Sequence, residues 1–379
     1  MTHKKILIVS GEPSGDLHAS NLIKDLKSLD PGLEFFGLGG RLSEKAGAEI
    51  LYDIADLAII GIVDVVKNGL KIRSAHKKLI ERIDAAKPDL AILVDYPGFN
   101  LHLAPQLHKR NIPIVYYISP QVWAWGAHRI ALIRRYVKKI IVFFKFEEEL
   151  YKKHGIDAAF VGHPLLDTVK PGHDKAWVFA KYGLSEGKTT IALLPGSRMS
   201  EVGSLLPVMI ESCKILDKRL GGAQFILSKH AGLPIEPYKK AAYGSGPKVS
   251  LAEGDTYDII AASDLAIAAS GTVTLETAIL GTPYVLVYKS DLLNYIAYLM
   301  VRKTRYLGIA NIVAGKAIIP EFLQFDMTPD RVSGAAVDIL THEDKRSKMA
   351  SDLEGVRLAL GSPGASKRAA AIINSLHLP

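Results

Sequence analysis

The stretch Lys87-Pro-Asp-Leu-Ala-Ile-Leu-Val-Asp-Tyr-Pro-Gly98 decides the fold class of this chain. Its apolar centre, Leu90–Val94, is bounded on both sides by turn-forming residues, and an amphipathic stretch follows it up to Arg110. A short continuous apolar run between turn signals is typical of a strand that is buried on both faces, as in a parallel sheet covered by helices. The stretch therefore predicts a β-strand, a tight loop and a helix.

The same pattern recurs along the chain on both sides of this stretch. The further predicted strands are residues 4–10, 34–37, a short crossover and strand within 46–52, 114–118 and 139–144, then 190–194, 224–227, 265–268 and 284–287. After the first strand, Ala19, Leu22, Ile23 and Leu26 recur at helical spacing. Buried strands that alternate with helices predict an α/β fold with parallel, doubly wound sheets and right-handed crossovers.

The chain is long enough for two domains. It has 379 residues, and a single hydrophobic core usually stops growing near roughly 250–300 residues. A turn-rich interval, 162–188, separates the two sets of strands and is interpreted as the linker. Residues 332–340, 342–353 and 365–376 are predicted helices, the last packing back across both domains. We expect domains at 1–165 and 166–340, followed by C-terminal helices at 341–379.

Composition and charge exclude several classes of protein. Hydrophobic residues make up 48% and charged residues 23%, which excludes disordered, collagen-like and coiled-coil chains. The lone Cys213 cannot form an intrachain disulfide, so we expect a reducing compartment. The first ten residues contain only four consecutive apolar residues, Ile6–Val9, so we predict no secretion signal. The apolar stretch 265–288 is interrupted by Gly271, Glu276 and Pro283, so we predict no membrane span. The net charge of +8 permits nucleic acid, phospholipid or phosphorylated partners without choosing among them.

Four polar loops follow predicted strands. They are Gly11-Glu-Pro-Ser-Gly-Asp16, Asp95-Tyr-Pro-Gly-Phe-Asn100, Pro195-Gly-Ser-Arg198 and Ser270-Gly-Thr272. In parallel sheets, ligands bind at the carboxyl ends of the strands, where helix N-termini offer N–H groups and partial positive charge. The sequence therefore predicts that the functional residues lie in these loops.

Each loop has a functional and a purely structural interpretation. Glycines in the first loop let the backbone approach a ligand, but the loop lacks the spacing of a dinucleotide site or a P-loop, and Ser14 also suits an ordinary helix cap. Asp95 suits a partly desolvated general base, or a turn residue before Gly98. The third loop, with Arg198, suits a diphosphate, or is a surface loop. Glu276 lies one turn inside an otherwise apolar helix, where a carboxylate needs partners.

Other site chemistries have weaker support. The histidines are scattered without metal-ligand spacing, so we expect no metal and no cofactor. No Gly-x-Ser-x-Gly elbow follows a predicted strand, which disfavours a serine hydrolase. Trp123 and the basic residues that follow it carry no RNP or KH signature, so we expect no nucleic acid partner. The apolar Ile59, Ile60, Val63 and Val66, with lysines downstream, suit a membrane-surface element or a core helix with a basic edge.

Motifs over nearly the whole chain resemble those of the lipid-A-disaccharide synthase family. The matching motifs are Ser10-Gly-Glu-Pro-Ser-Gly-Asp16, Gly37-Leu-Gly-Gly40, Ile60-Gly-Ile-Val-Asp64, Val94-Asp-Tyr-Pro-Gly-Phe-Asn100, Tyr117-Ile-Ser-Pro-Gln-Val-Trp-Ala-Trp125, Phe160-Val-Gly-His-Pro164, Leu194-Pro-Gly-Ser-Arg198 with Glu201, Ala269-Ser-Gly-Thr272 with Leu275-Glu276, and Asn311 followed by Pro320-Glu-Phe-Leu-Gln324. Pro13 departs from the family, in which alanine is common at this position. So many motifs in one order are more specific than any single loop.

The resemblance implies a GT-B fold, with two Rossmann-like domains facing a cleft, and an inverting glycosyltransferase. Such an enzyme joins UDP-2,3-diacylglucosamine to 2,3-diacylglucosamine 1-phosphate and forms the β-1,6 disaccharide and UDP. It implies catalytic roles for Asp95, as the base, and Arg198, with Glu276 on the ribose. The implied donor-binding residues are Glu12, Ser14, Gly15, Gly196, Ser197, Arg198, Ser270, Gly271, Thr272, Glu276 and Asn311.

The resemblance also implies surroundings and partners. We expect a cytoplasmic protein peripherally associated with an anionic inner membrane of a Gram-negative cell, contacted through Ile59, Ile60, Val63 and Val66. We also expect a homodimer. A UDP-N-acetylglucosamine 2-epimerase-like isomerase is the alternative with the same layout. A non-catalytic lipid-binding protein and a transferase acting on the lipid-linked muropeptide intermediate are further alternatives.

Overall fold

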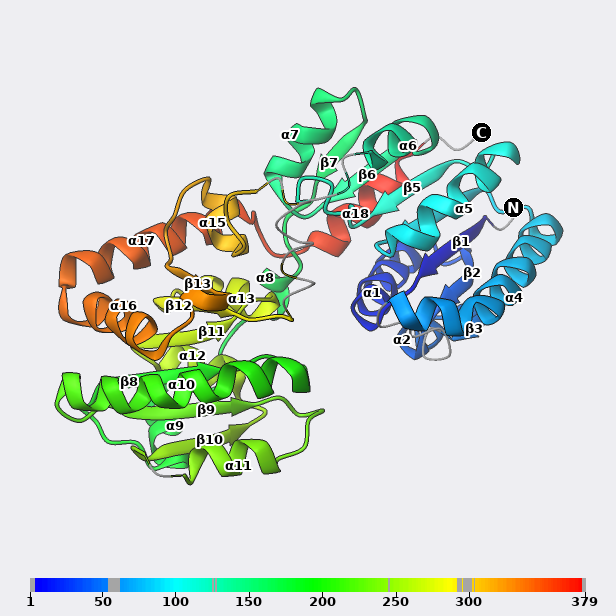
Figure 1. Ribbon diagram of the computed structural model, residues 1–379. Coiled ribbons are helices and arrows are strands. Elements are labelled where there is room, and N and C mark those ends of the chain that lie inside the picture. Colours follow the sequence, from blue (N-terminus) through cyan, green and yellow to red (C-terminus); the bar gives the residue numbers. More distant parts are fainter. Residues whose placement is uncertain are drawn as a thin grey trace. The chain divides into compact units, whose positions relative to one another are not determined.

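A computed structural model describes residues 4–53, 62–124, 126, 128–244, 246–291, 295, 302 and 304–376. The chain divides into two compact units, unit 1 (Met1–Pro164 with Gly361–Pro379) and unit 2 (Leu165–Leu360). Each unit contains one parallel sheet with helices on it (Figure 1). Within the described ranges, no helix combines the length and apolar character needed to cross a membrane.

Unit 1 contains a seven-stranded sheet in the order β3-β2-β1-β4-β5-β6-β7. The strands are β1 (Lys5–Ser10), β2 (Glu34–Gly39), β3 (Ala48–Asp53), β4 (Leu90–Val94), β5 (Ile114–Tyr117), β6 (Lys139–Val142) and β7 (Ala158–Phe160). Ser10 pairs with Val94, and Val94 pairs with Tyr117. This register places the carboxyl ends of β1, β4 and β5 side by side.

Helices cover both faces of this sheet. They are α1 (Pro13–Leu29), α2 (Arg41–Lys45), α4 (Ile62–Ala86), α5 (Pro97–Lys109), α6 (Arg129–Tyr136), α7 (Lys145–Lys153) and α18 (Ala365–Asn374). In β1, Leu7 and Val9 pack into the core formed with α4–α7, whereas Ile6 and Ile8 pack into the core formed with α1 and α18. Because successive strand residues enter opposite cores, the strands are apolar throughout instead of alternating.

Unit 2 contains a six-stranded sheet in the order β10-β9-β8-β11-β12-β13. The strands are β8 (Thr190–Leu194), β9 (Gln224–Lys229), β10 (Val249–Glu253), β11 (Leu265–Ala269), β12 (Tyr284–Tyr288) and β13 (Glu321–Leu323). The helices are α8 (Leu165–Thr168), α9 (Lys175–Tyr182), α10 (Met199–Leu220), α11 (Glu236–Ala242), α12 (Thr256–Ala262), α13 (Thr272–Leu280), α15 (Ile309–Ala314), the 3-10 turn η1 (Gln324–Asp326), α16 (Pro329–Thr341) and α17 (Glu343–Ala359). The predicted α/β class with parallel sheets is confirmed in both units.

The predicted linker at 162–188 is wrong over most of its length. It contains α9, whose N-terminus is capped by Asp174 accepting a hydrogen bond from Trp177 N at 2.8 Å. Asp258 of α12 accepts hydrogen bonds from Gly172 N at 2.6 Å and His173 N at 2.8 Å. These bonds tie the segment to unit 2. The sequence pattern missed them because the partners are far apart in the chain.

The C-terminal helices do not form the separate group predicted at 341–379. Helix α17 belongs to unit 2, whereas α18 belongs to unit 1, where it packs on α1 (Figure 1). Arg368 on α18 donates a hydrogen bond to Val161 O at 2.8 Å. The apolar face of α18, including Ala369 and Ile373, completes one of the two cores of unit 1.

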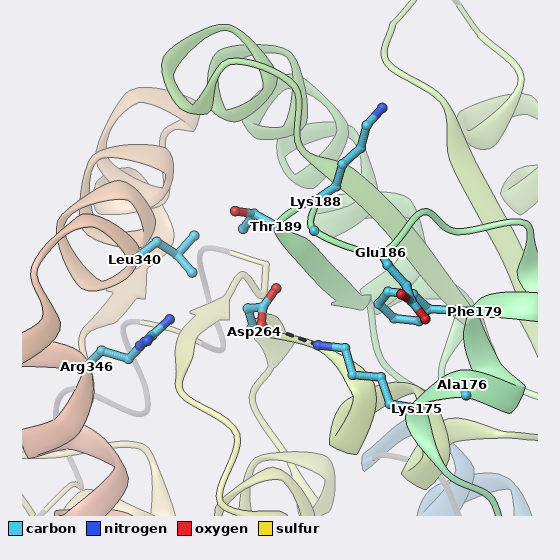
Figure 2. Close-up of a pocket in the computed structure, with 10 residues that line it drawn as sticks. Lys175, Ala176, Phe179, Glu186, Lys188, Thr189, Asp264, Leu340 and Arg346 are labelled. Atoms are coloured by element: carbon cyan, nitrogen blue, oxygen red, sulfur yellow. Dashed lines mark ion pairs between the residues drawn. The ribbon is translucent and has the colours of Figure 1, made fainter.

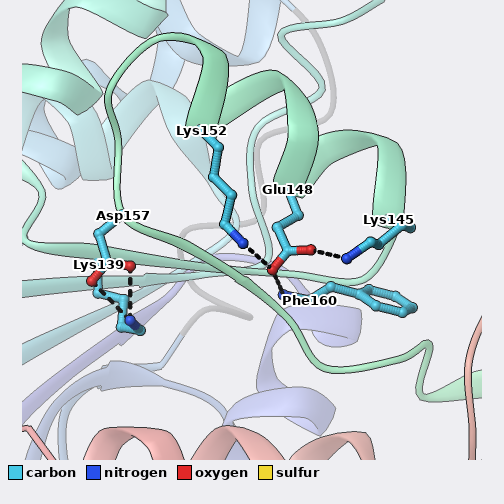
Figure 3. Close-up of polar contacts among 6 residues, drawn as sticks. All are labelled: Lys139, Lys145, Glu148, Lys152, Asp157 and Phe160. Carbon is cyan, nitrogen blue, oxygen red and sulfur yellow. Dashed lines mark hydrogen bonds and ion pairs between the residues drawn. The ribbon is translucent and has the colours of Figure 1, made fainter.

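Charged side chains of α7 attach this helix to β7, the last strand of unit 1 (Figure 3). Glu148 of α7 accepts hydrogen bonds from Lys145, from Lys152 at 2.9 Å and from Phe160 N of β7 at 3.3 Å. These hydrogen bonds outweigh partial burial and lower the pKa of Glu148 to about 2. The carboxylate therefore clamps α7 to the short edge strand β7, which contributes few ladder bonds of its own.

The predicted membrane-contacting residues cannot be placed. Ile59 and Ile60 lie outside the described residues, and Val63 and Val66 lie in α4 at positions whose side chains are not described.

Candidate active site

In unit 1, the loop after β1 leads directly into α1. Glu12 is the N-cap of this helix, Pro13 is its first residue, and Glu12 and Ser14 are exposed. Gly11 has no room for a side chain, because a Cβ there would lie 2.1 Å from Cδ1 of Tyr96. Gly15 is buried, and a Cβ on it would lie 3.5 Å from Cβ of Ser10. Gly11 thus allows the loop to pack closely against the end of β4, whereas a Cβ on Gly15 would make only an ordinary van der Waals contact.

Asp16, in the same motif, has a structural role. Its buried carboxylate accepts hydrogen bonds from Gly40 N at 2.9 Å, Leu42 N at 3.0 Å, Ser43 N at 3.1 Å and the Ser43 hydroxyl. These N–H groups belong to the N-terminus of α2, where they have no acceptor within the helix and need one from elsewhere. The contact explains why two motifs far apart in the sequence, the one ending at Asp16 and the one ending at Gly40, occur together.

Asp95 follows β4 at the same edge of the sheet and is half-buried. Burial, and secondly the negative charge of Glu12, raise the pKa of Asp95 from 3.8 to about 6. Asp95 and Tyr96 both have left-handed backbone conformations, with φ of 46° and 45°. Strained backbone and a shifted carboxyl pKa at one strand end are typical of a general base.

The motif after β5 is held by a buried acid that sequence reasoning did not single out. Glu147, on α7, accepts hydrogen bonds from the Ser119 hydroxyl at 2.7 Å and from the Trp123 indole Nε1 at 3.0 Å. Burial raises the pKa of Glu147 to about 7, although these hydrogen bonds oppose the shift. Ile118, which begins this loop, has φ of 67°, unusual for a β-branched residue. Glu147 thus fixes the loop beside Asp95.

Two uncharged histidine rings lie at the same edge of unit 1. Burial lowers the pKa of His18 to about 4 and that of His163 to about 3. Both rings pack edge-on against Phe143, with centroid distances of 5.5 Å and 5.6 Å. Near neutral pH they add polarity but no charge to this edge.

In unit 2, the third and fourth polar loops surround one cavity of about 560 Å³. It lies at the carboxyl ends of β8, β9 and β11, and its lining includes residues that the sequence analysis named: Gly196, Ser197, Arg198, Ser270, Gly271, Thr272 and Glu276. Such a volume is typical of small-molecule sites. Helices α10 and α13 both begin at this cavity, so their N-termini direct N–H groups and partial positive charge toward it.

Arg198 lies at the start of α10 with its side chain 73% exposed. Its guanidinium lies 3.2 Å from Glu201, and Glu201 also accepts hydrogen bonds from Ser197 N at 3.0 Å and Arg198 N at 3.3 Å. Gly196 has φ of 103°, and a Cβ there would lie 2.3 Å from Glu201 Oε2. Glu201 therefore holds the loop in shape, while most of the guanidinium stays available to an anion.

Glu276, on α13, has the partner that a buried carboxylate needs. Tyr257, on α12, donates a hydrogen bond to it at 3.0 Å, and burial raises the pKa of Glu276. Tyr257 also lines the cavity, as do Ser228 and Thr256, whose hydroxyls lie 3.0 Å apart. Sequence reasoning missed these three residues, since no local motif marks them.

Asn311 is not among the residues that line the cavity. It is 1% exposed, and its amide oxygen accepts hydrogen bonds from Ile318 N at 2.7 Å and Ile319 N at 3.0 Å. Its Nδ2 donates to Ile319 O at 3.0 Å and to Glu321 at 2.7 Å. In the structure, the hydrogen bonds of Asn311 join α15 to β13, and its contact with the diphosphate or sugar stays a prediction.

A second cavity, of about 500 Å³, lies at the amino ends of β8 and β11 (Figure 2). Acidic and basic side chains share its lining, and Lys175 Nζ lies 3.7 Å from Asp264 Oδ1. Among the described residues that line this cavity, none belongs to the four polar loops identified from the sequence. The described residues also contain no group of three or more His, Cys, Asp or Glu side chains placed to hold a metal ion.

Comparison with known proteins identifies close relatives and more distant structural neighbours. Residues 6–375 match the family model described as lipid-A-disaccharide synthetase. The chain is 42% identical over 378 residues to the lipid-A-disaccharide synthase of Syntrophus aciditrophicus, covering 99% of this chain and 98% of that protein. It is 39% identical over 371 residues to that of Geobacter metallireducens, covering 98% and 97%.

The structural neighbours show the fold alone, because their sequence identities are low. The structure of MurG from Acinetobacter baumannii aligns with a TM-score of 0.61 and 15% identity, covering 98% of this chain and 100% of that one. UDP-GlcNAc 2-epimerase from Neisseria meningitidis, bound to UDP-GlcNAc, aligns with a TM-score of 0.62 and 13% identity over the same shares. Two α/β domains of this type therefore occur in both transferases and epimerases.

Proposed function

The chain belongs to the lipid-A-disaccharide synthetase family and is a glycosyltransferase, and we propose that it joins UDP-2,3-diacylglucosamine to 2,3-diacylglucosamine 1-phosphate. The acceptor 6-hydroxyl attacks C1 of the donor sugar, the bond from C1 to the UDP oxygen breaks, and a β-1,6 bond forms. A single displacement inverts the configuration at C1, so no covalent intermediate on the protein is needed.

Asp95 is the observation that carries this proposal. A half-buried carboxylate at a strand end, with a pKa raised to about 6, is ionised at neutral pH and still basic enough to take a proton from a hydroxyl. In the proposed step, Asp95 accepts the acceptor's hydroxyl proton as C1 develops oxocarbenium character. The nearby Glu12 adds negative charge, which favours proton uptake by Asp95.

The cavity in unit 2 supports the donor half of the proposal. We propose that the N-terminus of α13, at residues 270–272, and the exposed guanidinium of Arg198 bind the diphosphate and stabilise the charge of the departing UDP. In this proposal Glu276, which lines the same cavity and is held by Tyr257, accepts hydrogen bonds from the ribose hydroxyls. Ser14 and Gly15 belong to the other unit, where we propose contact with the sugars.

The epimerase alternative is not favoured. Its fold is equally similar, but relatives that share 34–42% identity over nearly the whole chain are named as disaccharide synthases. The two activities differ in one simple respect, because an epimerase acts on its UDP-sugar without an acceptor.

The proposal extends to a membrane surface and a homodimer. Both proposed substrates carry acyl chains, and the net charge of +8 favours anionic headgroups. Replacing Ile59, Ile60 and Val63 together by serine is expected to release the protein from anionic liposomes in a flotation assay, and full retention would contradict the surface assignment. Sedimentation velocity tests the dimer.

The function is tested with purified protein and both lipid substrates in detergent, with EDTA present. Mass spectrometry follows the disaccharide and UDP together. We expect both products to appear in equal amounts and only when the acceptor is added. Consumption of the UDP-sugar without acceptor would overturn the transferase proposal in favour of an epimerase or a hydrolase.

A further inference from the structure

The turn that carries Asp95 has an unfavourable backbone conformation. Asp95 has φ of 46°, and Tyr96 has φ of 45° and ψ of 55°. Neither residue is glycine, and the left-handed region is unfavourable for residues with a Cβ, so two in succession require support from elsewhere. The direction of the Asp95 side chain depends on this backbone, because φ and ψ set where Cβ points.

The Asn100 side chain holds two successive carbonyl groups of this turn, and its backbone N makes the first helical hydrogen bond of α5. Its side-chain Nδ2 donates hydrogen bonds to Val94 O at 3.2 Å and to Asp95 O at 2.7 Å. Its backbone N donates to Tyr96 O at 3.0 Å. Asn100 is fully buried, so water does not compete for these bonds. One residue thus fixes the path of the chain from the last residue of β4 to the start of α5.

Tyr116 supplies the second hydrogen bond to the same carbonyl. Its hydroxyl, on the neighbouring strand β5, donates to Asp95 O at 2.6 Å. The amide of Asp95 in turn donates to Tyr117 O at 3.0 Å. The Tyr116 side chain is 0% exposed, so its position is set by core packing. The Asp95 peptide is therefore held from α5 and from β5 at once.

Packing alone does not explain why an amide side chain occupies the buried position 100. Its Oδ1 is buried and has no hydrogen-bond partner among the described residues. A buried polar atom without a partner is destabilising, and leucine would fill a similar volume without this penalty. The Nδ2 donor, which binds the carbonyl groups beside Asp95, therefore accounts for the presence of an amide at this position.

We propose that Asn100 and Tyr116 are positioning residues that hold the Asp95 turn in its left-handed conformation and so aim the Asp95 carboxylate at the acceptor hydroxyl. This inference rests on the proposed function, in which Asp95 is the base. A misaimed base slows proton transfer without changing how the substrates bind elsewhere, so the loss appears in kcat more than in KM.

Tyr116→Phe tests the inference with the smallest change, because it removes one hydroxyl and leaves the ring in the core. Tyr151→Phe is the matched control: Tyr151 is also 0% exposed in unit 1, and its hydroxyl donates to Pro120 O at 3.3 Å instead of to the Asp95 turn. Asn100→Leu is the second variant, and it removes both Nδ2 hydrogen bonds at similar volume. Thermal unfolding confirms that each variant is folded.

We expect Tyr116→Phe to lower kcat about tenfold and Asn100→Leu about a hundredfold, with KM and UDP affinity within about threefold of wild type. The pH profile is the readout that a merely structural role would not move. Wild-type kcat falls below about pH 6, where Asp95 becomes protonated. In both variants we expect the Asp95 carboxylate to be more exposed to solvent and its pKa to be lower. The acid limb of the kcat profile should therefore move to lower pH.

The outcomes separate this inference from the function on which it rests. If wild type shows acceptor-dependent transfer while Tyr116→Phe keeps both kcat and the acid limb of wild type, the positioning role is wrong. Equal losses in Tyr116→Phe and Tyr151→Phe would also overturn it, because the effect would then belong to any buried hydroxyl. A wild-type protein that transfers no sugar refutes the proposed function itself.

Discussion

Replacing Asp95 by asparagine should make the protein more stable and less active. Burial and the charge of Glu12 raise the pKa of Asp95 from 3.8 to about 6 in the folded protein. The fold thus favours the protonated form, and ionisation at neutral pH opposes folding. Each pKa unit corresponds to about 1.36 kcal/mol, so the opposing free energy is up to about 3 kcal/mol at pH 7.5 and about 0.5 kcal/mol at pH 4.

Asparagine has nearly the same shape and no charge, so Asp95→Asn removes this opposing term. Because Asp95 is only half-buried, solvent screening reduces the gain, and we expect about 1–2 kcal/mol at pH 7.5. For a unit of roughly 150–250 residues this corresponds to a Tm increase of about 2–8 °C. At pH 4 the gain should nearly vanish, since Asp95 is then protonated in the folded protein. Turnover should fall about 10²–10⁴-fold.

Differential scanning calorimetry of wild type and variant at both pH values measures the effect, and the disaccharide assay measures turnover. Asp84→Asn is the matched control of opposite sign, because a hydrogen bond from Arg110 lowers the pKa of Asp84, so its removal should destabilise at pH 7.5. A destabilised Asp95→Asn at pH 7.5, or an equal stability change at pH 7.5 and pH 4, would refute the reasoning.

Three further perturbations have defined outcomes. Arg198→Ala should weaken UDP binding about 10- to 100-fold by calorimetric titration and lower turnover with it, and unchanged affinity would remove Arg198 from the diphosphate site. Glu148→Gln should lower stability at neutral pH; since the folded pKa of Glu148 is lowered to about 2, the difference should shrink as pH falls toward 2, and a pH-independent difference would contradict the clamp. Gly37→Ala should impair folding, because the added Cβ would lie 1.8 Å from Ile8 O, and circular dichroism identical to wild type would show that the sheet can adjust.

The strands that the sequence predicted well are those in the middle of each sheet. β4 and β8 were predicted at their observed bounds, because both faces are covered and the apolar run is continuous. β7 and β13, with three residues each, and β10 were missed. These strands lie at sheet edges, where a continuous apolar run is not required. Helix α9 was hidden inside a turn-rich interval for a related reason: its anchor on α12 is non-local.

The candidate site shows the same division between local and non-local information. The loops with Arg198 and Thr272 were identified from glycines and hydroxyls after a predicted strand, and the structure places both at one cavity. Tyr257 was missed, since its hydrogen bond to Glu276 joins neighbouring helices. Asn311 carried a motif but uses its amide inside the fold.

The sequence by itself determined which segments form buried strands, which faces of the helices are apolar, and which loops follow the strands, because these features depend on residues close together in the chain. The family motifs indicated the glycosyl transfer reaction. Only the tertiary structure decided which polar side chains remain available for chemistry. Asp16 and Asn311 are consumed by internal hydrogen bonds, whereas Asp95 stays half-buried beside Glu12. Burial and partners at a strand end come from neighbouring strands and helices, and parallel pairing brings these together from distant parts of the chain.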